Sequence, residues 1–382
     1  MTPYTTVDHE KWRTSVRLFA ESEIRPVAGK LDEEEKFSAE LSRKMGQNKL
    51  YGIDISQKYG GLGRDTLTYI IAVEELARVD GSQAATMAAH NSLGINPIFT
   101  FGTEEQKEKY LPALCSGDVL WAFGLTEENA GSDARGVETV AQKVDNQWNI
   151  NGSKRYITNG SNTLLKGMTV LAITGEKNGK KELSTILVDR DLNGYTAKRT
   201  LGKMMWRASD TAEIELKNVK VPYSNLLGAE GKGLSNMLQT LDSGRLSIAA
   251  MGLGLAQGAF EMALNYSKKR KQFGKEISGF QSISFKLSDM AMKIELARNT
   301  LYNACWLKDN GHPFGKQAAM SKLYCSQIAK EVADEAVQVF GGAGLFKSNE
   351  IERFYRDQRI LQIGEGTSEI LKMVIARHIG LS

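Results

Sequence analysis

The segment TVAQKVDNQWNINGSKRYITNG, residues 139–160, decides the fold class because it opens a series of short β-type runs inside a sequence of otherwise helical character. The runs TVLAIT, STILVD and TAEIELKNVKVP continue the series, and KNGKK and DLNG lie between runs as turns. Short runs rich in β-branched residues and bounded by turn residues predict strands. We therefore expect a β-domain over residues 119–228.

Helical periodicity dominates on both sides of this β-domain. Before it, LTYIIAVEELARV (67–79) places apolar residues at helical spacing, and Thr103 is a predicted helix cap. After it, apolar residues spaced by threes and fours predict one long stripe in a helical bundle. The stripe consists of Leu287, Met290, Ile294, Ala297, Leu301 and Ala304.

These patterns predict a mainly α protein with a central β-domain. We expect an N-terminal helical domain (1–118), a middle β-barrel-like or sandwich domain (119–228) and a C-terminal four-helix bundle (229–382). The glycines of MGLGLAQGAF (251–260) do not form a dinucleotide-binding fingerprint, because position 257 is glutamine, and helix packing accounts for them better. No P-loop is present, so any nucleotide must be held by other means.

Composition narrows the class of protein. A chain of 382 residues with 41% hydrophobic content can bury more than one core. The balance of 49 basic and 45 acidic residues leaves +4, and the basic run KKRKQFGK (268–275) lacks interleaved aromatics, so we expect no nucleic-acid binding. The three cysteines lie far apart, without histidine at ligand spacing, which indicates no metal site and a reducing compartment.

The N-terminal segment carries charge throughout and lacks the apolar region of a signal peptide. We find no later run that approaches transmembrane length. The sequence therefore predicts a cytoplasmic protein without membrane insertion.

The stretch LQIGEGTSEI (361–370) places Glu365 between two glycines. Glycines let another molecule approach the main chain closely, which favours a ligand site. The same stretch also reads as a helix start, with Thr367 or Ser368 as the cap. Both interpretations can hold together, because a helix N-terminus offers free N–H groups to an anion or carbonyl. On the local sequence alone the cap is preferred.

Four segments taken together resemble the acyl-CoA dehydrogenase family of flavoenzymes. They are FGLTEENAGSD (123–133), YITNG (156–160), RKQFGK (270–275) and the run from QVFGGAGLF to LQIGEGTSEI (338–370). The resemblance extends over nearly the whole chain, including the order of helices, strands and helices. It implies FAD as cofactor and dehydrogenation of an acyl-CoA thioester to the 2-enoyl-CoA.

The resemblance implies cofactor contacts in the β-domain. Thr158 corresponds to the threonine whose hydroxyl meets flavin N5, and Tyr156 replaces a common tryptophan while keeping an aromatic face for the ring. Backbone and hydroxyl groups of the first segment would hold the flavin and the pantetheine-side phosphates. Taken alone, that segment would be an ordinary loop. Its matching residues are Phe123, Leu125, Thr126 and Ser132.

Further implied contacts reach the FAD of a neighbouring subunit. There an arginine pairs with the pyrophosphate in a way that lysine does not copy. Sharing one FAD between two subunits implies an obligate oligomer, and the family norm is a homotetramer. The matching residues are Arg270, Gln272, Phe273, Gln338 and Gly342. Thr367 and Glu369 match other cofactor contacts, although many relatives carry glutamine at the position of Glu369.

Glu365 matches the family's catalytic base, which removes the α-proton of the thioester while the β-hydrogen leaves as hydride. Gly364 and Gly366 would let the thioester lie against the main chain of the base, whose own N–H meets the carbonyl oxygen together with a ribityl hydroxyl of FAD. Some relatives place the base instead at the position of Gly244, which has no carboxylate here. Asp242 and Arg245 match residues that hold the CoA part.

Arg245 also fits a helix-surface salt bridge nearly as well, so its role stays open. Many straight-chain enzymes have a tyrosine where this chain has Gly364, and the small residues Ala85, Ala88 and Ala89 match the far end of the acyl cavity. These features predict a short to medium, branched or alicyclic acyl group. His90 in the same stretch is interpreted as a structural residue.

The resemblance implies an electron-transferring flavoprotein as the partner that receives the electrons. An acyl-CoA oxidase, which passes electrons to oxygen, is the alternative that the sequence scarcely separates. A nucleic-acid-binding flavoprotein of the same fold is disfavoured. Such a protein should carry an extended basic surface, whereas this chain has a net charge of only +4 and keeps Glu365.

Overall fold

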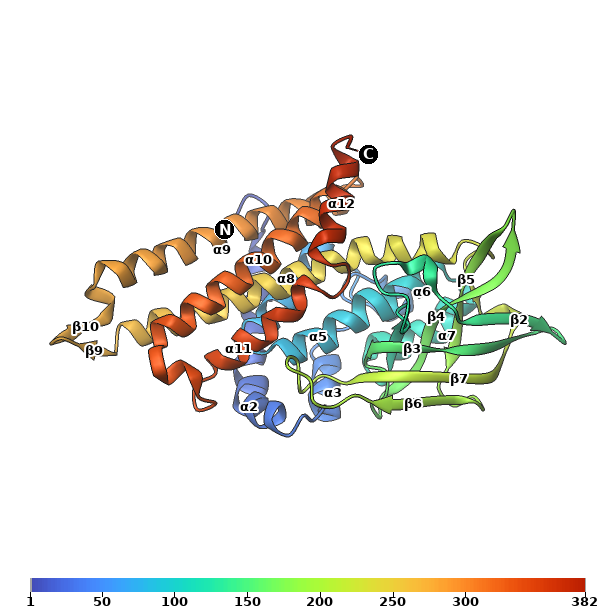
Figure 1. The fold of residues 1–382 in the computed structure, drawn as a ribbon, viewed down its shortest axis with the longest axis horizontal. Coiled ribbons are helices and arrows are strands. Elements are labelled where there is room, and N and C mark those ends of the chain that lie inside the picture. Colours follow the sequence, from blue (N-terminus) through green and yellow to red (C-terminus); the bar gives the residue numbers. More distant parts are fainter. Residues whose placement is uncertain (1, 382) are drawn as a thin grey trace.

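The computed structural model describes residues 2–381 as a helical region, a β-domain and a second helical region, in chain order (Figure 1). This order confirms the expected mainly α fold with a central β-domain. Figure 1 shows an elongated molecule with the β-domain at one end. The hairpin of β9 (Lys271–Gln272) and β10 (Lys275–Glu276) lies at the other end.

The N-terminal region packs around α4 (Thr66–Ala77), whose 12 residues are all buried. Polar caps set where its helices begin: Asp65 caps α4, and Thr103 accepts a hydrogen bond from the Gln106 N–H, as the cap prediction requires. The other elements are α1 (Val7–Phe19), α2 (Arg25–Glu33), α3 (Ala39–Gln47), α5 (Gly81–Ala89), α6 (Asn96–Phe101) and α7 (Glu104–Ser116), with π-helical turns at Ala20–Ile24 and His90–Ile95.

The β-domain is one eight-stranded sheet with the order β6-β7-β3-β2-β4-β5-β8, and β1 pairs in parallel with β4. The runs predicted as strands form β2, β3, β4, β5 and β7, whereas the short β1, β6 and β8 were not predicted. The strands are β1 (Leu120–Gly124), β2 (Val140–Val144), β3 (Gln147–Thr158), β4 (Leu165–Lys177), β5 (Lys180–Asp189), β6 (Tyr195–Arg199), β7 (Thr211–Pro222) and β8 (Leu226–Leu227).

Three long helices form the C-terminal region: α8 (Gly233–Ser267), α9 (Gln281–Asp309) and α10 (Gly315–Phe340), joined by the shorter α11 (Ile351–Asp357) and α12 (Ser368–His378). All six residues of the predicted stripe are buried on α9, which confirms it. On α8, a Cβ added at Gly258 would lie 2.3 Å from the Arg78 carbonyl oxygen. Helix packing therefore explains the glycines there, as expected.

Length and composition alone mark α8 as able to cross a membrane, which is weak evidence and does not overturn the expectation of no membrane insertion. Its most apolar window has a mean hydropathy of 1.2, and 78% of that window is buried inside the structure. A core helix passes the same test, because its apolar residues face neighbouring helices rather than lipid.

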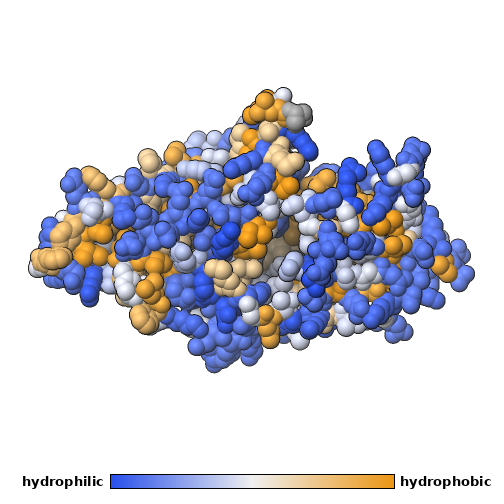
Figure 2. All heavy atoms as spheres, in the orientation of Figure 1, coloured by the Kyte–Doolittle hydropathy of each residue, from blue (hydrophilic) through white to orange (hydrophobic). Residues whose placement is uncertain are grey.

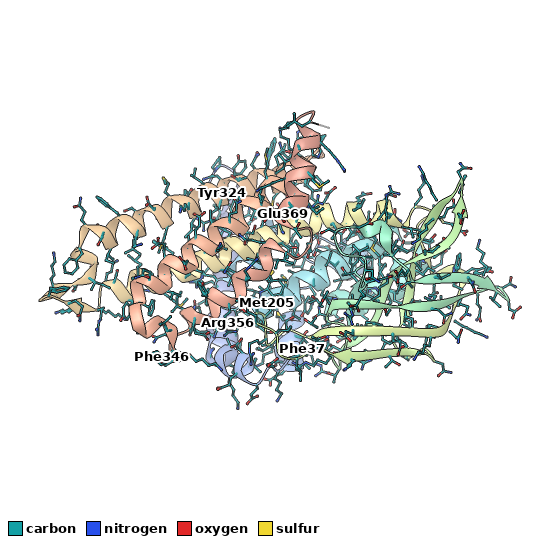
Figure 3. The ribbon with its side chains drawn as sticks, in the orientation of Figure 1. Phe37, Met205, Tyr324, Phe346, Arg356 and Glu369 are labelled. Atoms are coloured by element: carbon teal, nitrogen blue, oxygen red, sulfur yellow. The ribbon has the colours of Figure 1, made fainter. Side chains whose placement is uncertain are left out.

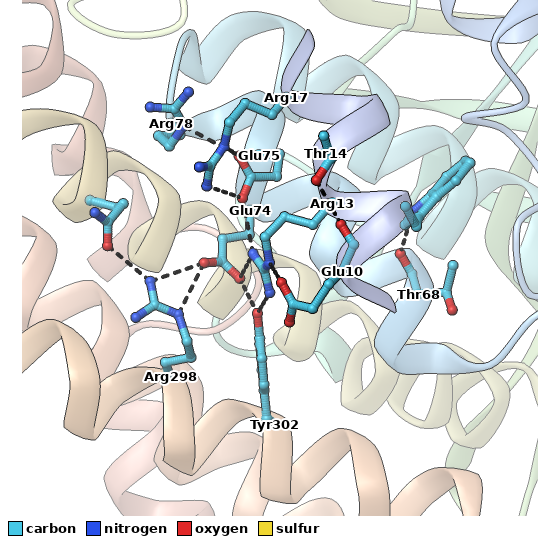
Figure 4. A network of polar contacts seen from close by, with 12 residues as sticks. Glu10, Arg13, Thr14, Arg17, Thr68, Glu74, Glu75, Arg78, Arg298 and Tyr302 are labelled. Carbon is cyan, nitrogen blue, oxygen red and sulfur yellow. Dashed lines mark hydrogen bonds and ion pairs between the residues drawn. The ribbon is translucent and has the colours of Figure 1, made fainter. Parts of the chain in front are cut away.

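A buried network of charges ties the two helical regions together (Figure 4). Glu74 of α4 is 2% exposed and accepts hydrogen bonds from Arg298 at 3.1 Å and from the Tyr302 hydroxyl at 2.5 Å. Arg13 of α1 lies 3.4 Å from the same carboxylate. Breaking one member would leave an uncompensated buried charge, so the network fixes α4 firmly between α1 and α9.

Candidate active site

Glu365 lies in the turn between the 3-10 segment Gln358–Gln362 and α12, and its backbone adopts the left-handed region with φ +52°. Gly366 follows with φ +98°. Thr367 then caps α12, because its side chain accepts the Ile370 N–H at 3.3 Å. The cap prediction is therefore confirmed. A left-handed conformation at a non-glycine residue costs roughly 1–2 kcal/mol, and such outliers cluster at functional sites.

The carboxylate of Glu365 points into the interior. Its Oε2 atom is buried and has no hydrogen-bond partner among the residues described. Burial raises the pKa of Glu365 to about 7, although the nearby Lys322 and Arg245 oppose the rise. An unpaired buried acceptor with a pKa near neutrality is typical of a working acid or base rather than of a packing residue.

The backbone N–H of Glu365 is also free of any hydrogen bond within residues 2–381. Turn geometry explains this, since the N–H groups of Ile363 and Gly364 both bond to the Ile360 carbonyl while the next N–H lies beyond that reach. The residue thus offers a donor and an acceptor to one ligand.

Gly244 of α8 lies directly against this carboxylate. A Cβ built on Gly244 would be only 2.2 Å from Glu365 Oε2 and 3.4 Å from Leu93 Cδ2. The structure therefore brings together the two chain positions at which, by resemblance, the family places its base. In this chain the glycine leaves the space that the Glu365 carboxylate fills.

Arg245 and Asp242 form an ion pair three residues apart on α8. The Arg245 side chain is only 7% exposed and its Nε has no hydrogen-bond partner, so the pair is not a surface salt bridge. Burial raises the pKa of Asp242, against the opposing charge of Arg245. The assignment of both residues to the CoA part stays a prediction.

A cavity of about 400 Å³ lies beside this pair and is lined in part by Asn96, Gln239 and Ser243. Figure 2 shows a hollow on the drawn face where the helical part meets the β-domain. Of the three small residues expected at the acyl cavity, Ala85 and Ala88 are buried in the main core and only Ala89 is partly exposed.

His90 has a structural role, as expected. Its Nδ1 accepts the Trp121 N–H at 3.1 Å, and its Nε2 lies 3.0 Å from the Leu114 carbonyl oxygen. Burial lowers the pKa of His90 to about 4, so the ring is neutral and both nitrogens are occupied.

The β-domain brings its two predicted cofactor segments together. The Arg155 N–H donates to the Thr126 carbonyl at 2.9 Å, which sets the segment of Phe123 and Leu125 beside the segment of Tyr156 and Thr158. Thr158 ends β3 and is partly buried. Tyr156 is 69% exposed with φ +58°, so its ring stands free on the surface.

Two residues that the sequence reasoning missed hold the first segment in place. The buried Lys154 Nζ donates to Glu127 Oε1 at 2.6 Å and to the Leu171 carbonyl at 2.7 Å. Glu127 also accepts the Thr139 hydroxyl at 2.6 Å. Through Glu127, which lies in that segment, this buried and hydrogen-bonded ion pair anchors the loop to Lys154 of β3. Downstream, Ser132 is exposed, and a Cβ at Gly131 would meet nothing within 4 Å.

The predicted cofactor residues of the C-terminal region lie apart from those of the β-domain. A second cavity of about 400 Å³ is lined by Arg270, Gln272 and Gly342, which come from two separate segments. No ion pair engages Arg270 within residues 2–381, and Phe273 at the hairpin tip is 94% exposed. Gln338 is exposed on α10 close by in the chain.

From Gly244 to Ser267, 23 residue steps along α8, the helix rises by about 35 Å, so this cavity lies far along α8 from Glu365. One chain therefore does not gather all predicted cofactor residues around a single site. This separation is what sharing of FAD between subunits would require. Figure 3 places Glu369 on the first turn of α12, where it is exposed.

These residues fit FAD. A free aromatic face at Tyr156 and the Thr158 hydroxyl suit a flat ring system, while the unpaired Arg270 beside open glycine backbone suits a pyrophosphate and an adenosine. Among residues 2–381, no cluster of three or more His, Cys, Asp or Glu could hold a metal ion.

Comparison with known proteins defines the class. The family models of the acyl-CoA dehydrogenase N-terminal, middle and C-terminal domains match residues 6–118, 122–219 and 231–380. A probable acyl-CoA dehydrogenase of Bacillus subtilis is 46% identical over 98% of both chains, and a short-chain specific acyl-CoA dehydrogenase of Clostridium acetobutylicum is 43% identical over 98% of both. The chain belongs to the acyl-CoA dehydrogenase family, whose members are FAD-dependent oxidoreductases.

Solved structures agree. Butyryl-CoA dehydrogenase from Megasphaera elsdenii has a TM-score of 0.95 and 42% identity over 98% of both chains. A chain in a structure described as the electron transferring flavoprotein of Acidaminococcus fermentans has a TM-score of 0.96 and 40% identity over 100% of both chains. A glutaryl-CoA dehydrogenase from Mycobacterium smegmatis, solved in complex with FADH2, has a TM-score of 0.94 and 30% identity over 99% of this chain and 95% of that chain.

Proposed function

We propose that Glu365 removes the α-proton of an acyl-CoA thioester while the β-hydrogen leaves as hydride, which yields the 2-enoyl-CoA. One observation carries this assignment: the residue combines an unpaired buried carboxylate oxygen with a free backbone N–H on a left-handed turn. FAD, when bound, accepts the hydride.

The two groups of Glu365 act at different atoms of the substrate. A carboxylate with a pKa of about 7 is basic enough to accept the proton and is still substantially ionised near neutral pH. The free N–H can donate to the thioester carbonyl oxygen, on which negative charge grows as the proton leaves. A fixed donor that need not reorganise stabilises this charge better than water does.

The acyl group is proposed to be short to medium, with room for branching or a small ring near Gly364. Outside its chain neighbours, a Cβ at Gly364 would come no closer than 3.7 Å to another residue, Ile360, so a side chain can begin there without a clash and its absence leaves that volume free. The relatives named short-chain specific and the butyryl-CoA dehydrogenase support the chain length. The branching rests on the missing side chain at position 364 alone.

Electrons are proposed to pass to an electron-transferring flavoprotein, which the likeness to a chain in such a structure supports. The functional unit is proposed to be a homotetramer, typical of the family, because the FAD contacts are divided between two places on one chain. The exposed apolar residues Phe285, Met292 and Leu296 on α9 offer a surface for such contacts. The cytoplasmic location stays a prediction.

The test is anaerobic bleaching of the bound flavin by straight, branched and cyclic acyl-CoAs, with wild type beside Glu365→Gln. We expect bleaching by short and branched thioesters and its loss, on the order of 10³-fold or more, in the variant. A variant that bleaches at the wild-type rate would remove Glu365 from this role. Rapid reoxidation by air with accumulating peroxide would assign an oxidase instead.

A further inference from the structure

Lys322 is the buried cation closest to the proposed base that no part of the assignment above uses. It lies in the first third of α10 and its side chain has no exposed area. Its Nζ donates to the Gly366 carbonyl at 2.6 Å, and this is its one hydrogen bond within residues 2–381. An ammonium buried with two spare donors costs stability unless another interaction compensates it.

The compensating group is the carboxylate of Glu365. Burial lowers the pKa of Lys322 to about 8, and the charge of Glu365 is the largest influence that opposes this fall. No ion pair forms between the two side chains, so their coupling acts through the low-dielectric interior rather than through contact.

Other charged or titratable groups face the same carboxylate from each neighbouring element. Arg245 of α8 adds a positive charge, but Asp242 already pairs with it. Tyr69 of α4 is neutral, since burial raises its pKa. Glu369 of α12 is exposed and acts on Lys322 more weakly than Glu365 does. Lys322 is therefore the one uncommitted cation of this group.

Lys322 also holds the backbone on which the base sits. Glu365 and Gly366 both have positive φ, and a turn of this kind persists only when its surroundings determine it. The bond from Lys322 fixes the Gly366 carbonyl on one side, and the Thr367 cap fixes the chain on the other. A neutral donor would suffice for that bond, so the charge needs a separate reason.

We propose that Lys322 is a positioning residue for the reaction: it fixes the Glu365–Gly366 turn and supplies the positive charge that keeps the base ionised when a thioester excludes water. The inference rests on Glu365 being the base. The charge opposes the desolvation that would otherwise leave the carboxyl protonated, while the hydrogen bond aims its carboxylate and N–H.

The experiment compares Lys322→Met, which removes donor and charge, with Lys322→Gln, which keeps a neutral donor. Lys203→Met is the control: Lys203 is less buried than Lys322, but it also donates to a carbonyl at 2.6 Å, on Ser209, and its pKa is also lowered to about 8 by burial. The single-turnover rate of flavin bleaching by butyryl-CoA is measured against pH, together with kcat, KM, FAD content and Tm.

We expect Lys322→Met to bleach about tenfold more slowly at neutral pH, with the ascending limb of its pH profile about one unit higher and KM little changed. Lys322→Gln should show the same shift of the ascending limb to higher pH. Its bleaching rate at the high-pH plateau should fall less than that of Lys322→Met, because glutamine keeps a hydrogen-bond donor. Lys203→Met should lose stability only. If Lys322→Met does not retain FAD, the profile of Lys322→Gln decides.

A wild-type pH profile in either Lys322 variant, or losses equal to those of Lys203→Met, would overturn the inference. The base itself is tested separately by Glu365→Gln. If that variant is inactive and the Lys322 variants behave normally, only the inference about Lys322 fails. If Glu365→Gln is active, the proposed function fails first.

Discussion

Replacing Gly244 by alanine should lower the rate of the reaction on the order of 10²-fold without harming the fold. The added methyl would lie 2.2 Å from Glu365 Oε2, whereas ordinary contacts begin near 3.4 Å, so the carboxylate must move by 3.4 − 2.2, or about 1.2 Å. A displacement of about 1 Å of a reacting group can cost on the order of 10²-fold in rate. Because the clashing atom ends a flexible side chain, the helix itself need not move.

Stability should respond in the opposite direction. Alanine is favoured over glycine inside a helix by about 1 kcal/mol, so the Tm of Gly244→Ala should stay level or rise slightly. The assay is stopped-flow flavin bleaching by butyryl-CoA alongside thermal unfolding. Gly258→Ala on the same helix is the contrast, because its methyl would meet the Arg78 backbone at 2.3 Å and should destabilise the protein. A Gly244→Ala enzyme within threefold of wild type would refute the proposed position of the base.

Three further changes have separate readouts. The pKa of Glu365 is raised to about 7 from 4.5, so the folded state binds more protons than the unfolded state between these values, and the free energy of unfolding falls as pH rises through them. The free energy of unfolding of Glu365→Gln relative to wild type, measured by chemical unfolding, should therefore grow by up to about 3 kcal/mol between about pH 4.5 and about pH 8, and a constant difference would contradict the shift. Gly364→Tyr should suppress bleaching by branched acyl-CoAs at least tenfold more than bleaching by butyryl-CoA, and equal effects would remove Gly364 from the acyl pocket. Arg270→Ala, and Arg270→Lys to a lesser degree, should weaken FAD binding about tenfold in fluorescence titration with an unchanged far-UV spectrum, and undiminished affinity would exclude Arg270 as a cofactor contact.

The sequence predicted those features that depend on local periodicity or on a short motif. The apolar stripe on α9 follows from spacing alone, and the Thr367 cap follows from a polar residue before an amphipathic run. The strands β2, β3, β4, β5 and β7 follow from short runs between turns. The strands β1, β6 and β8 were missed: two residues carry no pattern, and five residues lie at the limit at which β2 was recognised and β1 and β6 were not.

The geometry around Glu365 could not be predicted in this way. Gly244, Lys322 and Glu365 are far apart in the chain and meet only because α8, α10 and the turn before α12 pack together. One signal was available: Lys322 falls between the buried Ala318 and Cys325 at helical spacing, where a lysine interrupts an apolar face. A charge at such a position indicates either an error in the helix assignment or a buried partner.

The site gathers several locally unfavourable features in one place. A non-glycine residue with positive φ, a carboxylate oxygen without a partner and an ammonium with one hydrogen bond each lower stability, and each would be selected against in an ordinary core. Their common element is the Glu365–Gly366 turn, which the Lys322 hydrogen bond and the Thr367 cap hold in place. Because the same groups aim a base of pKa about 7 and a free N–H at one ligand, the local instability has a chemical explanation that packing does not provide.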